Sequence, residues 1–375
     1  MAERESGRGL CAVVLADGQG TRMRSLRPKP LHMLCGRAMV LHVIDALGAV
    51  AVDRVAVVVG TSAERVSKKL QDEGDLDTPT DVLEVPAQRG TGDAVSVALT
   101  ALPDDDLDDS DVLVVPSDLP LLRPETVSEL VARHRGSDSA ATLLTVRRAR
   151  PRGYGRVVRG RDGRVSEIVA EVDATEEQLQ LQETTALVFC FRRSVLAPAL
   201  RRTPPDPMTG EYYVSDVIRV LRDAGYSIEA VEVDDQDEVT EVDDRMALAA
   251  AEAELRRRTN LRWMATGVNI VDPASTYIDA SVVLGGDVTV FPNTYLQGRT
   301  AVGDGAELGP DTRLVDCMVG EGATVEMSSG RDAEVGPRAH VGPYAVLEPG
   351  AQVGEGGRVR PFTVASSTEG DDRAP

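Results

Sequence analysis

The chain has 375 residues, with 61 acidic and 41 basic side chains and a formal net charge of −20 at pH 7. This length allows two or three domains, and the hydrophobic content of 42% predicts a globular protein. The acidic balance argues against a nucleic-acid binder, because no basic stripe could neutralise phosphates. No apolar run approaches the ~20 residues of a membrane span, and MAERESGRG lacks the apolar stretch of a secretory signal. We therefore expect a cytoplasmic protein without membrane contacts.

The first 240 residues alternate between short β-branched runs and segments of helical periodicity. Buried strands are predicted at 11–16, 54–59, 111–116 and 140–146. Helices are predicted at 38–48, 62–71, 93–102 and 124–135. This alternation is typical of an α/β fold with helices on both faces of a mostly parallel sheet. The segment 154–191 could add an antiparallel layer, with a further helix at 212–224 and a strand at 227–233.

From about residue 263 the apolar period changes to six. Aliphatic residues recur at this spacing at Ile278, Leu284, Val290, Leu296, Val302, Leu308 and Leu314. The register shifts by one to Val319 and Val325 and resumes at Val335, Val341, Leu347, Val353 and Val359. Glycine follows several of them, including Gly285, Gly303, Gly320, Gly336 and Gly354. The pattern indicates a parallel β-helix, in which each aliphatic residue stacks on its counterpart one coil away; a set of ordinary short strands is the alternative.

These changes of period predict the domain organisation. An α/β domain would take residues 1–242, and a connecting helix would take 243–262, where acids come first and arginines last. The β-helix would cover 263–365, and a disordered tail would cover 366–375.

A glycine-rich turn follows the first predicted strand. It comprises residues 17–23 (D-G-Q-G-T-R-M) and is followed by Pro28 and Lys29. Glycines let backbone N–H groups approach a phosphate, although many such turns are merely tight loops. The turn is neither the dinucleotide fingerprint, which has a third glycine, nor a Walker loop, which ends in GK[ST]. Arg22 and Lys29 add two cations beside the turn, in a chain with only three lysines, so the combination predicts a polyphosphate ligand.

The same turn carries a family resemblance. L-A-D-G-Q-G-T-R-M with P-K at 28–29 resembles the signature of sugar-1-phosphate nucleotidyltransferases, and P-L-H-M-L-C-G-R-A-M narrows the resemblance to the bifunctional N-acetylglucosamine-1-phosphate uridylyltransferase / glucosamine-1-phosphate acetyltransferase family. Further matches follow in order: Q-R-G-T-G-D-A (88–94), S-D-L-P-L-L (117–122), G-Y-G-R (153–156), G-E-Y-Y-V-S-D (210–216) and V-D-D-R (242–245). The resemblance implies a Rossmann-like nucleotidyltransferase domain followed by a left-handed β-helix that forms homotrimers.

The resemblance also implies a role for each matching residue. Nucleotide contacts and the phosphate loop would come from Leu15, Ala16, Gly18, Gly20, Thr21, Gly90 and Thr91. The triphosphate and the sugar phosphate would be held by Arg22 and Lys29, the sugar by Gly155, and Mg²⁺ by Asp118 and Asp243. Asp243 stands where the family has an asparagine, and either it or Asp118 could instead be a helix cap. The attacking phosphate oxygen is already anionic, so the chemistry needs positioning and cations rather than a general base.

Several positions depart from the family. Asp17 replaces an alanine beside the polyphosphate, and the uracil-binding glutamine would fall at Glu84 or Val85. The sugar-binding glutamate aligns with Ala170, with Glu171 as a substitute only if the register slips, and the asparagine of E-x-N-T-G becomes Thr185. The phosphate and metal residues are retained while the residues that recognise base and sugar differ. This pattern favours a changed substrate over loss of function.

The repeats also depart from the family. They stop near Val364, after about five 18-residue coils. Glu348 stands at the position of an acetyltransferase-site arginine, and the lysine expected after the phenylalanine of P-F-T-V is absent. We therefore expect a shortened β-helix without acetyltransferase activity.

Three hypotheses remain open from the sequence. The first is an Mg²⁺-dependent transferase that uses UTP and N-acetylglucosamine 1-phosphate by default, or another nucleotide or sugar phosphate in a specialised pathway. The second is a non-catalytic protein that binds a nucleotide sugar as a sensor or partner subunit. The third is a structural β-helix assembly module. A measurement of turnover distinguishes the first hypothesis from the second, which predicts nucleotide-sugar binding without turnover.

Overall fold

The computed structural model describes residues 8–367, apart from 74–75, 77, 86 and 103–109. From residue 368 onward, the predicted tail at 366–375 therefore falls outside the described residues. Internal contacts divide the chain into two units, one of residues 1–32 and 38–248 and the other of 33–37 and 249–375. Across the described ranges, no helix has both the length and the apolar character that a membrane span needs.

The first unit is built on one mixed β-sheet, in which the central strand β1 is almost wholly buried. The main path of the sheet runs in the order β11-β7-β10-β6-β1-β4-β5. Its strands are β1 (Gly9–Ala16), β4 (Arg54–Val59), β5 (Thr80–Glu84), β6 (Ser110–Pro116), β7 (Ala141–Arg147), β10 (Glu183–Arg192) and β11 (Ile228–Val233). Neighbours pair in parallel except around β10, which is antiparallel to both β6 and β7. The predicted strands and the mostly parallel α/β sheet are thus confirmed.

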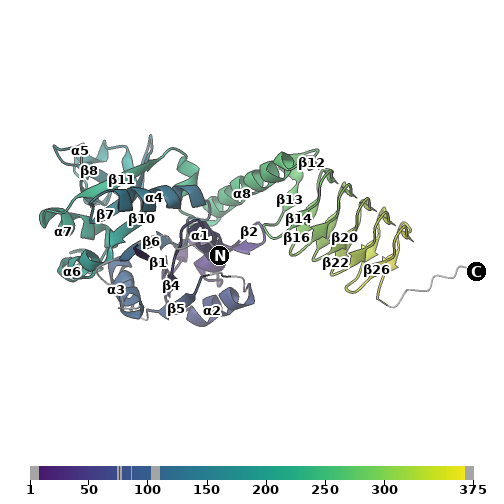
Figure 1. Cartoon of the computed structure of the whole chain (residues 1–375), viewed down its shortest axis with the longest axis horizontal. Helices are drawn as coiled ribbons and strands as arrows, with labels where there is room; N and C mark the ends of the chain where they lie inside the picture. The colour runs from purple at the N-terminus through teal and green to yellow at the C-terminus, as the bar shows by residue number, and fades with distance from the viewer. Residues whose placement is uncertain (1–7, 74–75, 77, 86, 103–109, 368–375) are drawn as a thin grey trace, which may run out of the picture. The chain divides into compact units, whose positions relative to one another are not determined.

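Helices lie on both sides of this sheet (Figure 1). They are α1 (Met39–Leu47), α2 (Ala63–Asp72), α3 (Thr91–Ala101), α4 (Pro124–Gly136), α6 (Arg193–Arg202) and α7 (Val217–Asp223). The helices predicted from the periodicity are confirmed to within a few residues. The sequence did not predict α6, because Pro198 inside it lacks a backbone donor and normally argues against a helix.

An antiparallel layer is present where the sequence placed one. β8 (Arg156–Arg159) pairs antiparallel with β9 (Val165–Val169), and β8 also pairs with β10. A short helix follows, α5 (Glu176–Leu179), which the strand-like pattern did not predict. Thr175 and Gln178 form a capping box that starts it.

The second unit is a left-handed parallel β-helix of three parallel sheets, whose short strands form a ladder (Figure 1). The first sheet contains β12 (Asn269–Ile270), β15 (Thr289–Val290), β18 (Glu307–Leu308), β21 (Thr324–Val325), β24 (His340–Val341) and β27 (Arg358–Val359). The second contains β13 (Tyr277–Ile278), β16 (Tyr295–Gln297), β19 (Arg313–Val315), β22 (Ser329–Arg331), β25 (Val346–Leu347) and β28 (Val364–Ala365). The third contains β14 (Val283–Leu284), β17 (Ala301–Val302), β20 (Met318–Val319), β23 (Glu334–Val335) and β26 (Gln352–Val353).

A helix and an early hairpin complete the second unit. The boundary between the two units falls within α8 (Arg245–Ala265), after Leu248. The hairpin β2 (Met33–Leu34) and β3 (Arg37–Ala38) contributes residues 33–37. Its Cys35 donates its N–H to Glu252 Oε2 at 2.7 Å and accepts the Ala280 N–H at 2.8 Å. These contacts give the L-C-G-R motif a structural role beside α8 and the first coil.

The six-residue aliphatic positions are the buried residues of the short strands. Leu296, for example, stacks between Ile278 and Leu314 in the second sheet. The register seen in the sequence first shifts between Leu314 and Val319, which stacks on Val302. Gly330 then takes the stacked position after Leu314. A Cβ on Gly330 would lie 3.2 Å from Leu314 Cδ2 and 3.3 Å from Cys317 Sγ. Cys317 therefore occupies the space that an aliphatic side chain fills in the other coils.

A column of glycines lies at one corner of the β-helix. A Cβ on Gly303 would lie 2.7 Å from the Glu321 N atom, and one on Gly320 would lie 2.5 Å from the Pro337 N atom. Backbone atoms of the next coil therefore occupy the space a side chain would need. Gly354 differs, because no atom lies within 4 Å of its Cβ position.

We expect Gly320→Ala to lower the free energy of unfolding by about 2 kcal/mol, because its Cβ overlaps backbone that cannot rotate away. Urea denaturation of the whole chain, followed by circular dichroism, measures this change. Gly354→Ala is the matched control and should change stability by no more than about 0.5 kcal/mol. Equal destabilisation by the two substitutions would contradict the packing argument.

Candidate active site

The glycine-rich loop after β1 folds back onto Lys29. Gly20 has a φ of 60° and precedes a short 3-10 helix, Thr21–Met23. L side chains rarely adopt this conformation, and a Cβ at Gly20 would lie 2.8 Å from Lys29 Cβ. Glycine at position 20 therefore allows the Lys29 stem to approach the loop closely. Gly18 has no atom within 4 Å of its Cβ position, so its contact with a nucleotide stays a prediction.

Three carboxylates converge beside Lys29. They belong to Asp118, Glu241 and Asp243, and one oxygen from each lies within 4.8 Å of the others. Asp118 follows β6, and its carbonyl accepts the Val242 N–H at 2.9 Å, which brings 241–243 to the end of that strand. Asp118 and Asp243 were predicted from the sequence, but Glu241 was not. The signal was the E-V-D spacing, because alternate residues of an extended chain point to the same side.

Lys29 lies between two of these carboxylates. Its Nζ donates hydrogen bonds to Asp118 Oδ2 and Asp243 Oδ1. Burial alone would lower the pKa of Lys29, but the charges and hydrogen bonds of Asp118 and Asp243 outweigh burial and raise that pKa above its ordinary value. The Lys29 side chain is 11% exposed, so its cation is fixed in the site.

Arg22 is the second cation of the site, and its side chain is more exposed than that of Lys29. Its Nη2 lies 3.0 Å from Asp243 Oδ2, and its side chain is 73% exposed. An exposed ion pair of this kind contributes little to stability, so the guanidinium can leave Asp243 for a phosphate at small cost. The two cations predicted from the sequence are thus brought to the same carboxylate.

The carboxylates suit a divalent cation. Burial, together with the charges of Asp118 and Asp243, raises the pKa of Glu241 to about 7. Asp118 Oδ1 is buried, and no group in the described part of the chain donates a hydrogen bond to it. A buried anionic oxygen without a donor is costly, and a bound cation removes that cost. Mg²⁺ prefers carboxylate oxygens, so this donor set fits it.

Asp244 has a different role from its neighbour. Its Oδ1 accepts the N–H groups of Met246 and Ala247 at 2.9 and 2.8 Å, which caps the start of α8. Asp243 instead faces Lys29 and Arg22. The sequence left open whether Asp243 was only a helix cap, and the geometry assigns that role to Asp244.

The loop before α3 packs against the G-E-Y-Y-V segment. Gly90 has a φ of 96°, and a Cβ there would lie 2.5 Å from the Tyr212 carbonyl oxygen. Thr91 Oγ1 accepts the Val214 N–H at 3.0 Å, and the Gly92 N–H donates to the Tyr212 carbonyl at 2.7 Å. Gly90 and Thr91 therefore hold this segment in place, whether or not they also contact a nucleotide.

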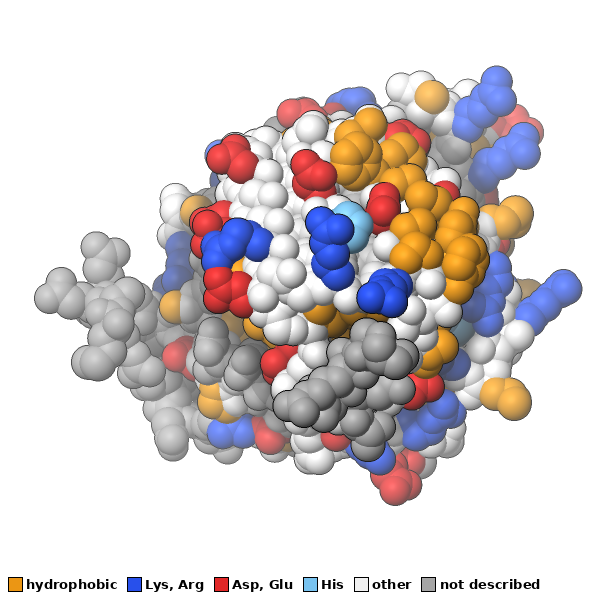
Figure 2. Space-filling view, turned by 90° about the vertical axis from the view of Figure 1, so that its right-hand side faces the viewer, with side chains coloured by type: hydrophobic (Ala, Val, Ile, Leu, Met, Phe, Trp, Pro, Cys, Tyr) orange, Lys and Arg blue, Asp and Glu red, His pale blue; other side chains and the backbone are white. Residues whose placement is uncertain are grey.

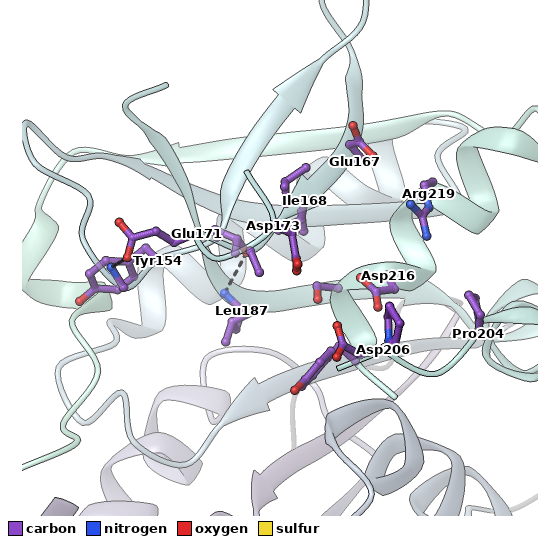
Figure 3. A pocket seen from close by; sticks show the side chains of 18 of the residues that line it. Tyr154, Glu167, Ile168, Glu171, Asp173, Leu187, Pro204, Asp206, Asp216 and Arg219 are labelled. Atoms are coloured by element: carbon purple, nitrogen blue, oxygen red, sulfur yellow. Dashed lines mark hydrogen bonds between the residues drawn. The ribbon is translucent and has the colours of Figure 1, made fainter. Parts of the chain in front are cut away.

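Two cavities adjoin at this site. The smaller, of about 160 Å³, is lined by six of the predicted residues: Leu15, Ala16, Gly18, Lys29, Thr91 and Asp118. The larger, of about 570 Å³, is lined by Gly155 and by side chains that Figure 3 shows. Glu241 and Leu187 line both cavities. The remaining predicted residues, all of them described, line neither: Gly20, Thr21, Arg22, Gly90 and Asp243.

The positions that depart from the family lie around these cavities. Ala170 and Thr185 line the larger one, and Val85 is a buried apolar residue. Asp17 lines a third cavity, of about 640 Å³, and its carbonyl accepts a hydrogen bond from the Gln88 amide. Burial raises the pKa of the Asp17 carboxyl above its ordinary value.

Comparison with known proteins agrees with this geometry. Residues 12–225 match the MobA-like NTP transferase domain family. The chain is 41% identical over 357 residues to the bifunctional protein GlmU of Corynebacterium jeikeium, covering 95% of this chain and 72% of that protein. It is 44% identical over 352 residues to the bifunctional protein GlmU of Kineococcus radiotolerans, covering 93% of this chain and 70% of that protein. The chain belongs to the GlmU family.

Membership of the GlmU family identifies the first unit as a nucleotidyltransferase domain and the protein as an enzyme. It also contradicts one prediction from the sequence. We expected no acetyltransferase activity, but these GlmU relatives are named bifunctional, and the match covers 95% of the chain, so it includes the β-helix. The differences at Glu348 and near the end of the repeats therefore do not support loss of the second activity.

Proposed function

We propose that this GlmU-family protein transfers a uridylyl group from UTP to a sugar 1-phosphate, with N-acetylglucosamine 1-phosphate as the default acceptor, and releases pyrophosphate. The observation that carries the proposal is the pair of adjoining cavities beside the Lys29 and carboxylate cluster. The smaller cavity lies at the carboxyl ends of β1 and β6, where open α/β sheets bind ligands. The larger cavity has room for a sugar, and Glu241 borders both.

The side chains present would act by positioning and by neutralising charge. The sugar phosphate attacks the α-phosphate with an oxygen that is already anionic, so the chain needs no base. Lys29 lines the smaller cavity, where it would hold the sugar phosphate and the α-phosphate next to each other. Arg22 would swing from Asp243 to the triphosphate and stabilise the negative charge that builds up on the leaving pyrophosphate.

The carboxylate cluster would hold Mg²⁺. Asp118 and Asp243 would provide oxygen ligands, and Glu241 lies close enough to orient a water of the ion. When bound, Mg²⁺ would supply charge neutralisation on the phosphates that react. The donor-free Asp118 Oδ1 supports this assignment independently of the family.

The test of the reaction is pyrophosphate release, measured with Mg²⁺ for each common NTP against a panel of sugar 1-phosphates. Asp118→Asn should lower kcat by at least about 100-fold, because it removes the negative charge of the carboxylate that would bind Mg²⁺ and that pairs with Lys29. Asp138→Asn is a matched control on a fully exposed side chain and should leave turnover unchanged. Tight nucleotide-sugar binding without turnover of any pair would favour the non-catalytic hypothesis instead.

The assignment of Mg²⁺ predicts that Lys29 competes with the ion for the same oxygens. Lys29→Met should lower the melting temperature without Mg²⁺, since two carboxylates lose their shared cation. Addition of Mg²⁺ should then raise the melting temperature by about 2–4 °C more than in the wild type. The exposed Lys68 provides the control Lys68→Met. Identical Mg²⁺ responses in all three proteins would exclude the ion from this cluster.

We also propose that the β-helix assembles copies of the chain into a homotrimer. The exposed apolar residues of its last described coils are Tyr344, Val346, Phe362 and Val364. Figure 2 shows apolar side chains grouped on the face of the molecule turned to the viewer. Tyr344 stacks on Phe362 at 5.2 Å, and Val346 pairs with Val364, so the four form one surface. Contiguous exposed apolar patches of this kind mark association surfaces.

Sedimentation equilibrium should give three times the chain mass of 40.0 kDa. Phe362→Glu, at a side chain that is 81% exposed, should shift the protein toward monomer, because burial of its charge opposes association. Leu26→Glu, on another highly exposed residue, should not. A monomeric wild type would refute the trimer.

A further inference from the structure

Leu187 has a backbone conformation that L side chains rarely adopt. Its φ is 56°, in the left-handed region that favours glycine. It lies in β10, where the register with β7 shifts between Thr185 and Phe189. Bulges of this kind redirect side chains and are common beside active sites. A branched residue kept in such a conformation indicates that its side chain has a role there.

The Leu187 side chain borders both cavities of the active site. Its N–H donates to Thr185 Oγ1 at 3.0 Å, the dashed line in Figure 3, and its side chain points away from those of Ile168 and Asp173. Leu187 and Glu241 line both cavities, so a ligand that extends from the larger cavity to Lys29 in the smaller one would lie beside them. The atoms beside Leu187 would therefore belong to the part of the sugar nearest its phosphate.

The larger cavity that Leu187 borders has apolar lining groups beside Gly155. A Cβ at Gly155 would lie 3.0 Å from Ile168 Cγ2 and 3.3 Å from Thr185 Cγ2, so two hydrocarbon groups lie against this glycine. Ala170 also lines this cavity without a polar side-chain atom. The Thr185 hydroxyl already accepts a hydrogen bond from the Leu187 backbone.

Polar groups also line the larger cavity. Asp173, Asp206 and Asp216 are among its lining residues, together with Arg219 (Figure 3). Carboxylates accept hydrogen bonds from sugar hydroxyls. The cavity therefore offers a sugar both hydrogen-bonding partners and hydrocarbon contacts.

We propose that Leu187 is a specificity-determining residue, which favours a sugar 1-phosphate with a deoxygenated carbon beside it over one with a hydroxyl there. The inference rests on the proposed function and narrows its sugar substrate. A hydroxyl placed against Leu187 loses its hydrogen bonds to water and gains none. Hydrophobic sites reject an added hydroxyl by about 100-fold at most, so we expect a preference of about 10- to 100-fold.

The experiment measures kcat and KM with UTP and Mg²⁺ for glucose 1-phosphate and its 2-, 3-, 4- and 6-deoxy analogues. The wild type should prefer at least one deoxy analogue in kcat/KM. Leu187→Gly should reduce that preference at least 10-fold, mainly through KM, because the contact is made in the ground state as well as in the transition state. Leu187→Asn, which tolerates a positive φ, should reverse it by offering a hydrogen-bonding amide.

Leu187→Ala is a second variant that tests the same contact should Leu187→Gly fail to fold. Its matched control is Leu179→Ala, on α5 and outside both cavities. The control should keep the wild-type preference. Turnover of these sugars with no deoxy preference, or with a preference unchanged in the Leu187 variants, overturns this inference but leaves the proposed transferase standing. If the wild type turns over none of the sugar phosphates in this or the broader panel, the proposed function fails and the inference fails with it.

Discussion

The active site depends on one electrostatic arrangement, the Lys29 ammonium held between Asp118 and Asp243. Two carboxylates that lie close together in a partly buried site repel each other unless a cation lies between them. Lys29 provides that cation and joins three distant segments: the loop after β1, the end of β6 and the chain before α8. The glycine at position 20 is a consequence, because the Lys29 stem passes where a Cβ would stand.

The charged side chains beside Lys29 and the side chains that line the larger cavity come from different parts of the first unit. The cations and two of the carboxylates stand next to strand ends or to α8, where hydrogen bonds such as that from Val242 to Asp118 limit their movement. The larger cavity is lined instead by residues 153–155 before β8, by β9 and β10, and by residues of the segment 204–219. Retained phosphate-binding residues are therefore compatible with a changed sugar, because the two sets of side chains belong to separate elements.

The β-helix follows a different physical rule. Its core requires one buried side chain per strand and backbone contact at the corners, so the stacked glycines and aliphatic residues repeat with the coil. Coil length can vary when one side chain compensates for another. Cys317 beside Gly330 is such a compensation, and it explains why the six-residue spacing shifts without ending the fold.

Periodicity and local chemistry were sufficient to predict much of this protein. The strands of the parallel sheet, the hexapeptide repeat and the two cations could be read from the sequence, since each depends on neighbouring residues. The aspartates at 118 and 243 came from the family resemblance. The tertiary structure decided the rest. Glu241 joins the cluster only because β6 lies beside 241–243, and Asp244 rather than Asp243 caps α8 because the latter is drawn to Lys29. The role of Leu187 depends on a bulge between paired strands, and α6 forms despite Pro198 because packing outweighs the lost backbone hydrogen bond.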